Sequence, residues 1–182
     1  MSEGVIAGRY ATALYKYCAE HGVATTLYKT AEEVEKAFIS TPELRKTLIN
    51  PVVPAKDKIS IMMTVGGKNA DKYFENFVRL VVDKKREEYM REIFLKYSQI
   101  YRKKNNISLV EVTTAVEIDE NMLKKITSII SSRTESKVEL KYKIDLAIIG
   151  GFVLKIDSQQ LDASIDRELK NLRLKLVNSN KV

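Results

Sequence analysis

The spacing of apolar residues changes near the middle of the chain, from a helical period to a strand period. Up to about residue 104, apolar side chains recur every three or four positions, which places them on one face of an α-helix. Residues 107–116 are instead rich in β-branched side chains, and apolar and charged residues alternate from 138 to 145. The change predicts an N-terminal helical domain over residues 1–105 and a C-terminal domain with strands over residues 106–182.

Six helices with short connections are predicted in the N-terminal part, which makes it an all-α bundle. Capping residues and prolines separate them: Thr41-Pro42-Glu43 restarts a helix, Pro51 and Pro54 break the chain, and Asp71 can cap the helix that follows. The predicted helices cover residues 5–19, 26–40, a segment from 41, a segment from 54 to 64, a segment from 71, and 87–104.

Two of these helices carry more apolar surface than a single core contact requires. The helix over 5–19 has two adjacent apolar stripes, which are Ile6, Tyr10, Ala13 and Tyr17, and Ala7, Ala11, Leu14 and Cys18. The helix after Asp71 is apolar over a similar arc, with Tyr73, Phe74, Phe77, Val78, Leu80 and Val81. A groove between two such helices can receive an amphipathic helix from another chain. Burial of both stripes by the other four helices explains the pattern equally well.

The second domain is predicted in the order strand, helix, strand, hairpin, helix, which is a small α+β arrangement. Asp119 can cap its first helix, and Gly150-Gly151 precede a strand, where they favour a sharp bend or bulge over an anion site. The final helix has an apolar stripe made of Ile165, Leu169, Leu172 and Leu176. The whole chain is therefore assigned to the α+β class.

Cysteine and histidine are too scarce for most catalytic and metal sites. The chain has one cysteine, Cys18, and one histidine, His21, so neither an internal disulfide nor a Cys/His zinc site can form. His21 stands before Gly22 at a predicted helix end, where it would satisfy a late carbonyl group. The segment VGGKNADK (65–72) lacks P-loop spacing, and the carboxylates form no EF-hand pattern. We therefore expect no catalytic residue, no metal and no cofactor.

The net charge of +7 arises mainly in the first part of the chain, notably in DKKRE (83–87) and YRKKNN (101–106). Such runs can bind phosphates, although solvated helix ends often carry them. Because the chain has no RRM, KH or C₂H₂ signature, a basic nucleic-acid-binding protein is the alternative and not the leading hypothesis. The single cysteine suits a reducing compartment, and neither a membrane-spanning stretch nor a secretory signal is apparent.

Three segments, in this order and spacing, resemble the delta subunit of bacterial F-type ATP synthase, which is equivalent to the mitochondrial oligomycin-sensitivity-conferring protein. They are RYATALY (9–15), NFVRLVVDKKR (76–86), and GGFVLKID (150–157) followed by LDASIDRELKNL (161–172). The resemblance covers nearly the whole chain. The sequence departs from the family pattern after Ser164, because the family commonly has a basic residue and then glycine where Asp166 and Arg167 stand.

The resemblance implies a non-catalytic stator subunit at the cytoplasmic face of the bacterial plasma membrane, with no nucleic-acid partner. It implies that residues 1–105 receive the N-terminal helix of an alpha subunit of the catalytic head, in a groove between the first and fifth helices. Residues 106–182 would bind the C-terminal ends of the peripheral-stalk b subunits. The candidate alpha-subunit contacts are Ile6, Tyr10, Ala13, Leu14, Tyr17, Phe77, Val78, Leu80 and Val81. The candidate b-subunit contacts are Leu154, Ile156, Ile165, Leu169 and Leu172. Which of them face the core is left open by the sequence.

Overall fold

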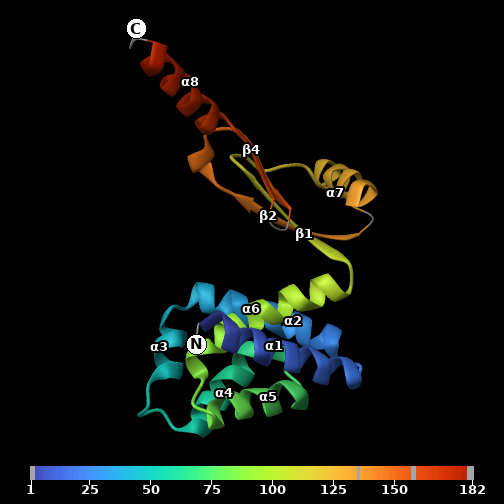
Figure 1. Cartoon of the computed structure of the whole chain (residues 1–182), viewed down its shortest axis with the longest axis vertical. Coiled ribbons are helices and arrows are strands. Elements are labelled where there is room, and N and C mark those ends of the chain that lie inside the picture. Colours follow the sequence, from blue (N-terminus) through green and yellow to red (C-terminus); the bar gives the residue numbers. More distant parts are fainter. Residues whose placement is uncertain (1–2, 135, 157–158, 180–182) are drawn as a thin grey trace. The chain divides into compact units, whose positions relative to one another are not determined.

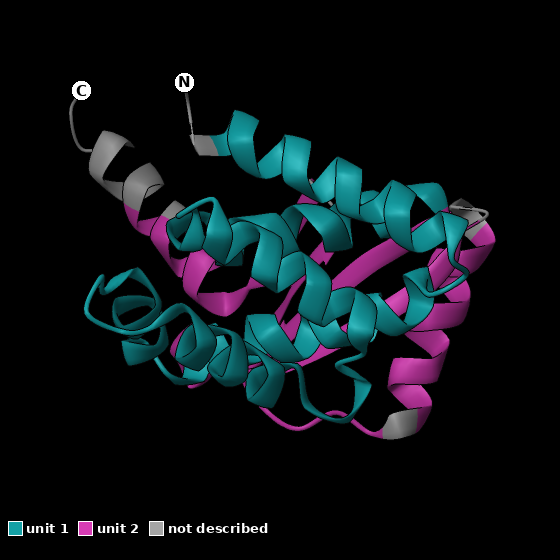
Figure 2. Cartoon of the chain, turned by 90° about the horizontal axis from the view of Figure 1, so that it is seen from below, with its two compact units in different colours: residues 1–104 teal, residues 105–182 magenta. Residues whose placement is uncertain are grey.

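The computed structural model describes residues 3–134, 136–156 and 159–179, and the chain divides into two compact units, Met1–Lys104 and Asn105–Val182 (Figures 1 and 2). The division falls one residue before the predicted domain boundary. The first unit is helical and the second combines helices with a sheet, so the α+β class predicted from the sequence fits the chain.

The described part of the first unit contains six α-helices and two 3₁₀ turns. They are α1 (Glu3–Glu20), α2 (Ala24–Ser40), α3 (Glu43–Ile49), α4 (Ala55–Gly66), η1 (Gly67–Asn69), α5 (Lys72–Asp83), η2 (Glu87–Tyr89) and α6 (Met90–Lys104). Helix α6 packs against α1 and α2, and α4 packs against α5 (Figure 1). The sequence predicts one helix over residues 87–104, whereas the structure has η2 followed by α6 there. The two could not be separated because a 3₁₀ turn at a helix N-terminus keeps nearly the same apolar spacing.

Two helix starts illustrate how local chemistry sets the boundaries. Asp71 caps α5 as predicted, since its carboxylate accepts hydrogen bonds from the backbone N–H groups of Tyr73 and Phe74 at 3.0 and 2.9 Å. The predicted side-chain cap at Thr41 is wrong. Pro42 already has helical angles, with φ −57° and ψ −26°, and the backbone carbonyl of Thr41 accepts from the Leu44 N–H instead.

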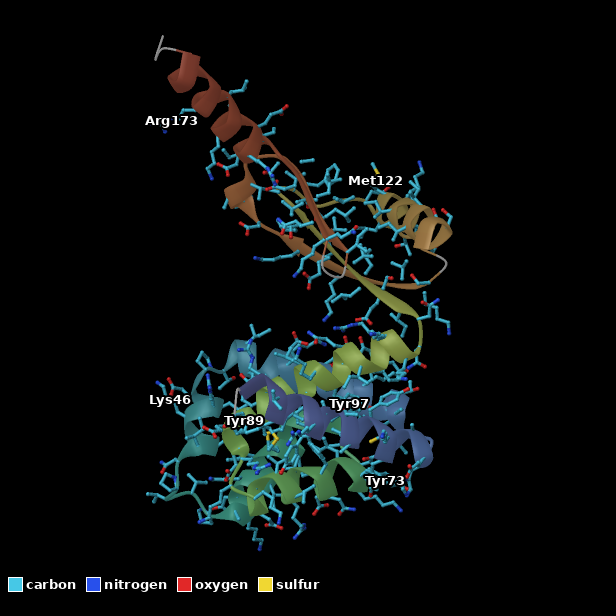
Figure 3. The ribbon with its side chains drawn as sticks, viewed as in Figure 1. Lys46, Tyr73, Tyr89, Tyr97, Met122 and Arg173 are labelled. Atoms are coloured by element: carbon cyan, nitrogen blue, oxygen red, sulfur yellow. The ribbon has the colours of Figure 1, made fainter. Side chains whose placement is uncertain are left out.

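The core of the first unit draws apolar side chains from all six helices. Phe94 lies near its centre, with its ring 5.5 Å from that of Phe74 and 6.0 Å from that of Phe77. Tyr97 on α6, labelled in Figure 3, is fully buried, and its hydroxyl donates to the carbonyl of Ala24 at 2.9 Å. On α1 the buried stripe is Ala7, Ala11, Leu14 and Cys18. One of the two α1 stripes is therefore core, which leaves the other available.

The second unit contains a four-stranded sheet in the order β2-β1-β3-β4 (Figure 1). Its elements are β1 (Ile107–Thr114), α7 (Glu120–Thr134), β2 (Lys137–Ile144), η3 (Leu146–Ile148), β3 (Gly151–Ile156), β4 (Gln159–Ser164) and α8 (Ile165–Ser179). Helix α7 connects the parallel strands β1 and β2, while β3 runs antiparallel to both β1 and β4. The predicted order of strand, helix, strand, hairpin and helix is confirmed.

A small core lies between α7 and one face of this sheet. Val110, Val112 and Ile130 form its buried centre. The partly buried apolar side chains around them are Ile118, Ile126, Val138, Leu140, Tyr142, Leu154 and Ile156. At the start of β3, Gly151 has φ +76°, and a Cβ there would overlap the carbonyl oxygen of Ala163. Only glycine fits this position, as expected for a glycine at a sharp strand start.

Candidate partner-binding surfaces

An open groove with a volume of about 600 Å³ runs between α1 and α5. Its lining side chains are Arg9, Tyr10, Ala13, Leu14, Tyr17, Asn76, Phe77 and Leu80. Apart from one guanidinium and one amide, these side chains are apolar or aromatic. The groove therefore has the character of a site for an apolar helix face, and not of a site for a polar metabolite.

Aromatic contacts between α1 and α5 build the walls of this groove. The ring of Tyr10 meets that of Phe77 edge-on at 6.3 Å, and the ring of Tyr17 meets that of Tyr73 at 5.6 Å. Tyr73, on α5, is labelled in Figure 3. Because the early part of α1 contacts the middle of α5 and the late part of α1 contacts its start, the two helices run antiparallel. Edge-on ring pairs of this kind hold side chains in defined orientations.

Burial separates the floor of the groove from its open surface. Leu14 and Phe77 are 1% and 6% exposed, so they form the floor. Leu80 is 46% exposed, and Ala13 is also exposed. An exposed apolar surface that continues into buried apolar side chains is typical of a site that another chain covers.

Six of the nine predicted alpha-subunit contacts line the groove, namely Tyr10, Ala13, Leu14, Tyr17, Phe77 and Leu80. The other three do not. Val78 and Val81 are fully buried, since their face of α5 points into the bundle, and this corrects their assignment to a contact surface. Ile6 is partly buried on α1 and is not part of the groove lining.

Three polar residues of the groove region were not predicted from the sequence as contacts of the groove. Arg9 and Asn76 belong to its lining. Arg86, from the turn after α5, donates through Nη1 to the hydroxyl of Tyr10 at 3.0 Å, and its guanidinium carbon lies 5.3 Å from the centre of that ring. A search for apolar stripes passes over such residues. The signal that could have found them is their place within the RYATALY and NFVRLVVDKKR segments.

The predicted b-subunit contacts fall into two groups. Leu154 and Ile156 pack against the core between the sheet and α7, so their assignment to a contact surface is corrected. Ile165, Leu169 and Leu172 are 44%, 52% and 52% exposed on α8. This helix contacts β4 and η3 and extends past the sheet (Figure 1). Leu176, the last member of the predicted stripe, lies outside the side chains that the structure describes.

Titratable side chains provide little chemistry here. Burial raises the pKa of the Cys18 thiol to about 12, so at neutral pH this thiol is protonated and a poor nucleophile. The ring nitrogen Nδ1 of His21 lies 2.8 Å from the carbonyl oxygen of Tyr17, which confirms its predicted role at the end of α1.

Within residues 3–134, 136–156 and 159–179, no three His, Cys, Asp or Glu side chains are grouped to hold a metal ion. None of the helices in these ranges has the length and apolar character needed to span a membrane.

The basic runs are partly engaged inside the first unit. In the first run Arg86 binds Tyr10, and Glu87 forms an ion pair with Lys58 at 2.7 Å. In the second run Arg102 donates to the hydroxyl of Tyr28 at 3.1 Å. These residues contribute to packing within the bundle, which weakens the case for a continuous phosphate-binding surface.

Comparison with known proteins agrees with the resemblance seen in the sequence. The family described as ATP synthase delta (OSCP) subunit matches residues 6–176. ATP synthase subunit delta of Phocaeicola vulgatus is 35% identical over 98% of this chain and 97% of its own length. ATP synthase subunit delta of Bacteroides thetaiotaomicron is also 35% identical, over 100% of this chain and 98% of its own length.

The fold is shared with a chain of a solved assembly, the mitochondrial ATP synthase hexamer of Toxoplasma gondii. The TM-score is 0.72 at 19% identity, over 94% of this chain and 97% of that chain. At this identity the likeness concerns the fold alone. None of these matches supports the nucleic-acid-binding alternative. By its sequence and its family match, this chain belongs to the ATP synthase delta (OSCP) subunit family.

Proposed function

We propose that this protein is a non-catalytic peripheral-stalk subunit of a bacterial F-type ATP synthase. It links the alpha/beta catalytic head to the b subunits at the cytoplasmic face of the plasma membrane. Membership of the delta family supports this function, and relatives that match over nearly their whole length carry the same subunit name. The observation that carries the proposal is the apolar groove between α1 and α5.

The occupant of the groove is the N-terminal helix of an alpha subunit. The groove presents apolar and aromatic side chains along two antiparallel helices, which is the arrangement that receives the apolar face of an amphipathic helix. Covering on the order of a few hundred Å² of apolar surface at about 25 cal/mol per Å² supplies several kcal/mol before the cost of association. The first unit would thereby attach to the catalytic head.

The second contact uses the exposed apolar side chains of α8. Ile165, Leu169 and Leu172 recur at helical spacing and stay accessible, so they suit the C-terminal helices of the b subunits. Because one chain carries both contacts, each raises the effective concentration of the other, and the linkage is tighter than either contact alone.

The work of such a subunit is mechanical. A rotor turning inside the head would drag the head with it, and a stator that holds the head still lets the torque change the conformation of catalytic sites on other subunits. The subunit needs long-lived contacts at both ends and no reaction of its own. The protonated Cys18 thiol and the structural hydrogen bond of His21 agree with that absence of chemistry.

A calorimetric titration tests the groove. The full chain is titrated with a peptide of the alpha-subunit N-terminal segment from the same organism. We expect binding to the wild type, and at least tenfold weaker binding to Ala13→Asp, because the carboxylate would be buried against the apolar peptide face. Thr12→Asp adds the same charge to an exposed neighbouring position of α1 that is not part of the groove lining, so it is the matched control.

Circular dichroism of both variants separates binding from folding. Retained helicity with weakened binding of Ala13→Asp alone supports the proposal. Absence of binding to the wild type, or equal binding of all three proteins, contradicts it.

A further inference from the structure

Two guanidinium groups without a carboxylate partner lie at one end of the α1–α5 groove, one in its lining and one beside it. Arg9 belongs to the groove lining, next to Tyr10, and Arg86 reaches Tyr10 from the turn after α5. Among the residues that the structure describes, neither arginine forms an ion pair with an acidic side chain. Arg79, which also stands on α5, is paired with Glu75 at 2.8 Å. Neither guanidinium therefore has a direct ion-pair partner among the described residues, although Asp83 ends α5 three positions before Arg86.

The contacts of Arg86 hold its charge in place without neutralising it. Its Nη1 donates to the Tyr10 hydroxyl at 3.0 Å, while the guanidinium lies over the ring at 5.3 Å from the centroid. A phenol is a neutral partner, so the positive charge persists, and the stacked position limits its hydration on one side. The edge contact of Tyr10 with Phe77 fixes the ring in turn.

The opposite end of the groove has a different character. There Tyr17, His21 and Tyr73 form a cluster with ring separations of 4.7 to 5.6 Å. The ammonium of Lys72 lies 5.2 Å from the centre of the Tyr73 ring, and the carboxylate of Asp71 caps the same turn. A positive charge at this end thus stands beside a negative one. The two ends of the groove therefore differ in the charged groups that contact their aromatic side chains.

We propose that Arg9 and Arg86 bind a carboxylate of the helix that occupies the groove, and that this contact fixes the direction and register of that helix. The proposal rests on the proposed function, in which the occupant is the alpha-subunit N-terminal helix. The apolar walls recognise any amphipathic helix and accept it in either direction. A guanidinium pair at one end removes this ambiguity, because charge-assisted hydrogen bonds to a carboxylate are strong and geometrically specific. Arg86 also acts as a positioning residue, since it holds Tyr10 in the groove wall.

The test measures the affinity of the full chain for the alpha-subunit N-terminal peptide at low and high ionic strength. The variants are Arg9→Gln, Arg86→Gln, and Arg86→Lys, which keeps the charge. Lys36→Gln is the matched control, because it removes one positive charge at an exposed position of α2 outside the groove. A second peptide series replaces each glutamate or aspartate in turn by its amide.

We expect each Arg→Gln change to weaken binding roughly threefold to tenfold at low salt and to reduce the salt dependence, while Lys36→Gln changes neither. Arg86→Lys should keep much of the salt dependence but bind less tightly, because an ammonium lacks the planar fork. One amide peptide should bind all Arg→Gln variants and the wild type with nearly equal affinity, and this identifies the partner carboxylate.

Binding of the wild type that is unchanged by either Arg→Gln substitution, with the same salt dependence, overturns the arginine proposal and leaves the groove assignment intact. The arginine proposal is also overturned if all amide substitutions in the peptide weaken binding equally, or if none of them weakens it. Failure of the wild type to bind the peptide contradicts the proposed function itself, together with everything that rests on it. Circular dichroism excludes unfolding as the cause of a loss, and the Tyr10–Phe77 contact in an NMR spectrum shows whether Arg86→Gln has also moved the Tyr10 ring.

Discussion

The two units of this chain bury their apolar residues to very different degrees. The first unit has buried side chains on each of α1 to α6, and its large ones, such as Phe74, Phe94 and Tyr97, are at most 1% exposed. Among the described residues of the second unit, only four apolar side chains are buried, namely Val110, Val112, Ala115 and Ile130, and the last two are 5% and 6% exposed. The same unit leaves many large apolar side chains exposed, including Leu146, Ile149, Phe152, Leu161, Leu169 and Leu172.

This difference indicates two ways of building a contact surface. The first unit has a complete core, and its groove is a local opening between two helices that the core already fixes. The second unit has a thin core and leaves apolar side chains such as Leu169 exposed, and we expect its partner to cover them. We therefore expect the first unit to be stable by itself and the second to gain stability from its partner.

The largest expected effect is the difference in stability lost when a core residue and an exposed apolar residue are each replaced by alanine. Phe94→Ala removes a ring that packs against Phe74 and Phe77, and should lower the free energy of unfolding of the first unit by about 3–5 kcal/mol. Leu169→Ala in α8 should change stability by less than about 0.5 kcal/mol while weakening binding of the b subunits. Urea unfolding followed by circular dichroism compares them. Equal stability losses would remove the distinction between the two units.

The next effect concerns the buried ion pair between Lys58 and Glu87. Both side chains are nearly buried, at 7% and 11% exposed, and their charged atoms are 2.7 Å apart. Lys58→Met should destabilise the first unit by about 3 kcal/mol, because it leaves the Glu87 carboxylate buried without its partner.

The double variant Lys58→Met with Glu87→Leu should recover most of that loss, since it removes both charges. Lys36→Met breaks an exposed pair with Glu33 and should cost less than about 1 kcal/mol. Thermal unfolding of all three variants supplies the comparison. A double variant no more stable than Lys58→Met alone would argue against an electrostatic origin of the loss.

A smaller effect is expected from glycine replacements, one in each unit. Gly151→Ala places a Cβ against the Ala163 carbonyl and strains a positive φ, and should cost about 2–3 kcal/mol in the second unit. Gly22→Ala in the first unit also has a positive φ, +71°, but nothing lies within 4 Å of its Cβ, so it should cost about 1 kcal/mol. Hydrogen exchange of the β3 and β4 amides measures the local change. Unchanged protection in Gly151→Ala would show that the strand start can shift without loss.

The last effect is absent at neutral pH and is a loss of stability of the first unit at alkaline pH. Burial raises the pKa of Cys18 in the folded state from 9.0 to about 12. The folded state therefore keeps a proton that the unfolded state releases, and the stabilisation is complete below pH 9 and is lost as the pH rises from 9 to about 12. Burial also raises the pKa of Tyr97, which acts in the same direction.

Because Cys18 is the only thiol of the chain, maleimide labelling reports on the first unit alone. We expect slow labelling at pH 8, at a rate set by opening of the first unit, and faster labelling as the pH rises through this range. Labelling at pH 8 as fast as in urea would contradict the burial of Cys18.

Most of the fold could be predicted from the sequence because its signals are local. The spacing of apolar residues, the cap at Asp71 and the glycines at 150 and 151 each act over a few residues, and the helices and strands follow them closely. The predicted side-chain cap at Thr41 is wrong because Pro42 joins the helix and the backbone carbonyl of Thr41 accepts the hydrogen bond instead.

The candidate site was predictable only in part, because side-chain direction depends on the packing of distant helices. Val78 and Val81 share the apolar arc of α5 with Leu80, and only the position of α5 against its neighbours decides that they are core. Leu154 and Ile156 became core for the same reason, when α7 covered their face of the sheet. Arg86 contacts Tyr10 across 76 positions of sequence, and no local pattern records such a pair.

The central claim is that this chain joins the catalytic head to the b subunits, and a native mass spectrometry experiment tests it most directly. Purified head, the soluble part of the b subunits and the full chain are mixed in all combinations, with Ala13→Asp and Leu169→Asp as variants. We expect a complex of all three only when the wild-type chain is present, with Ala13→Asp losing the head and Leu169→Asp losing the b subunits. A head–b complex that forms equally well without the chain, or a chain that binds neither, would contradict it.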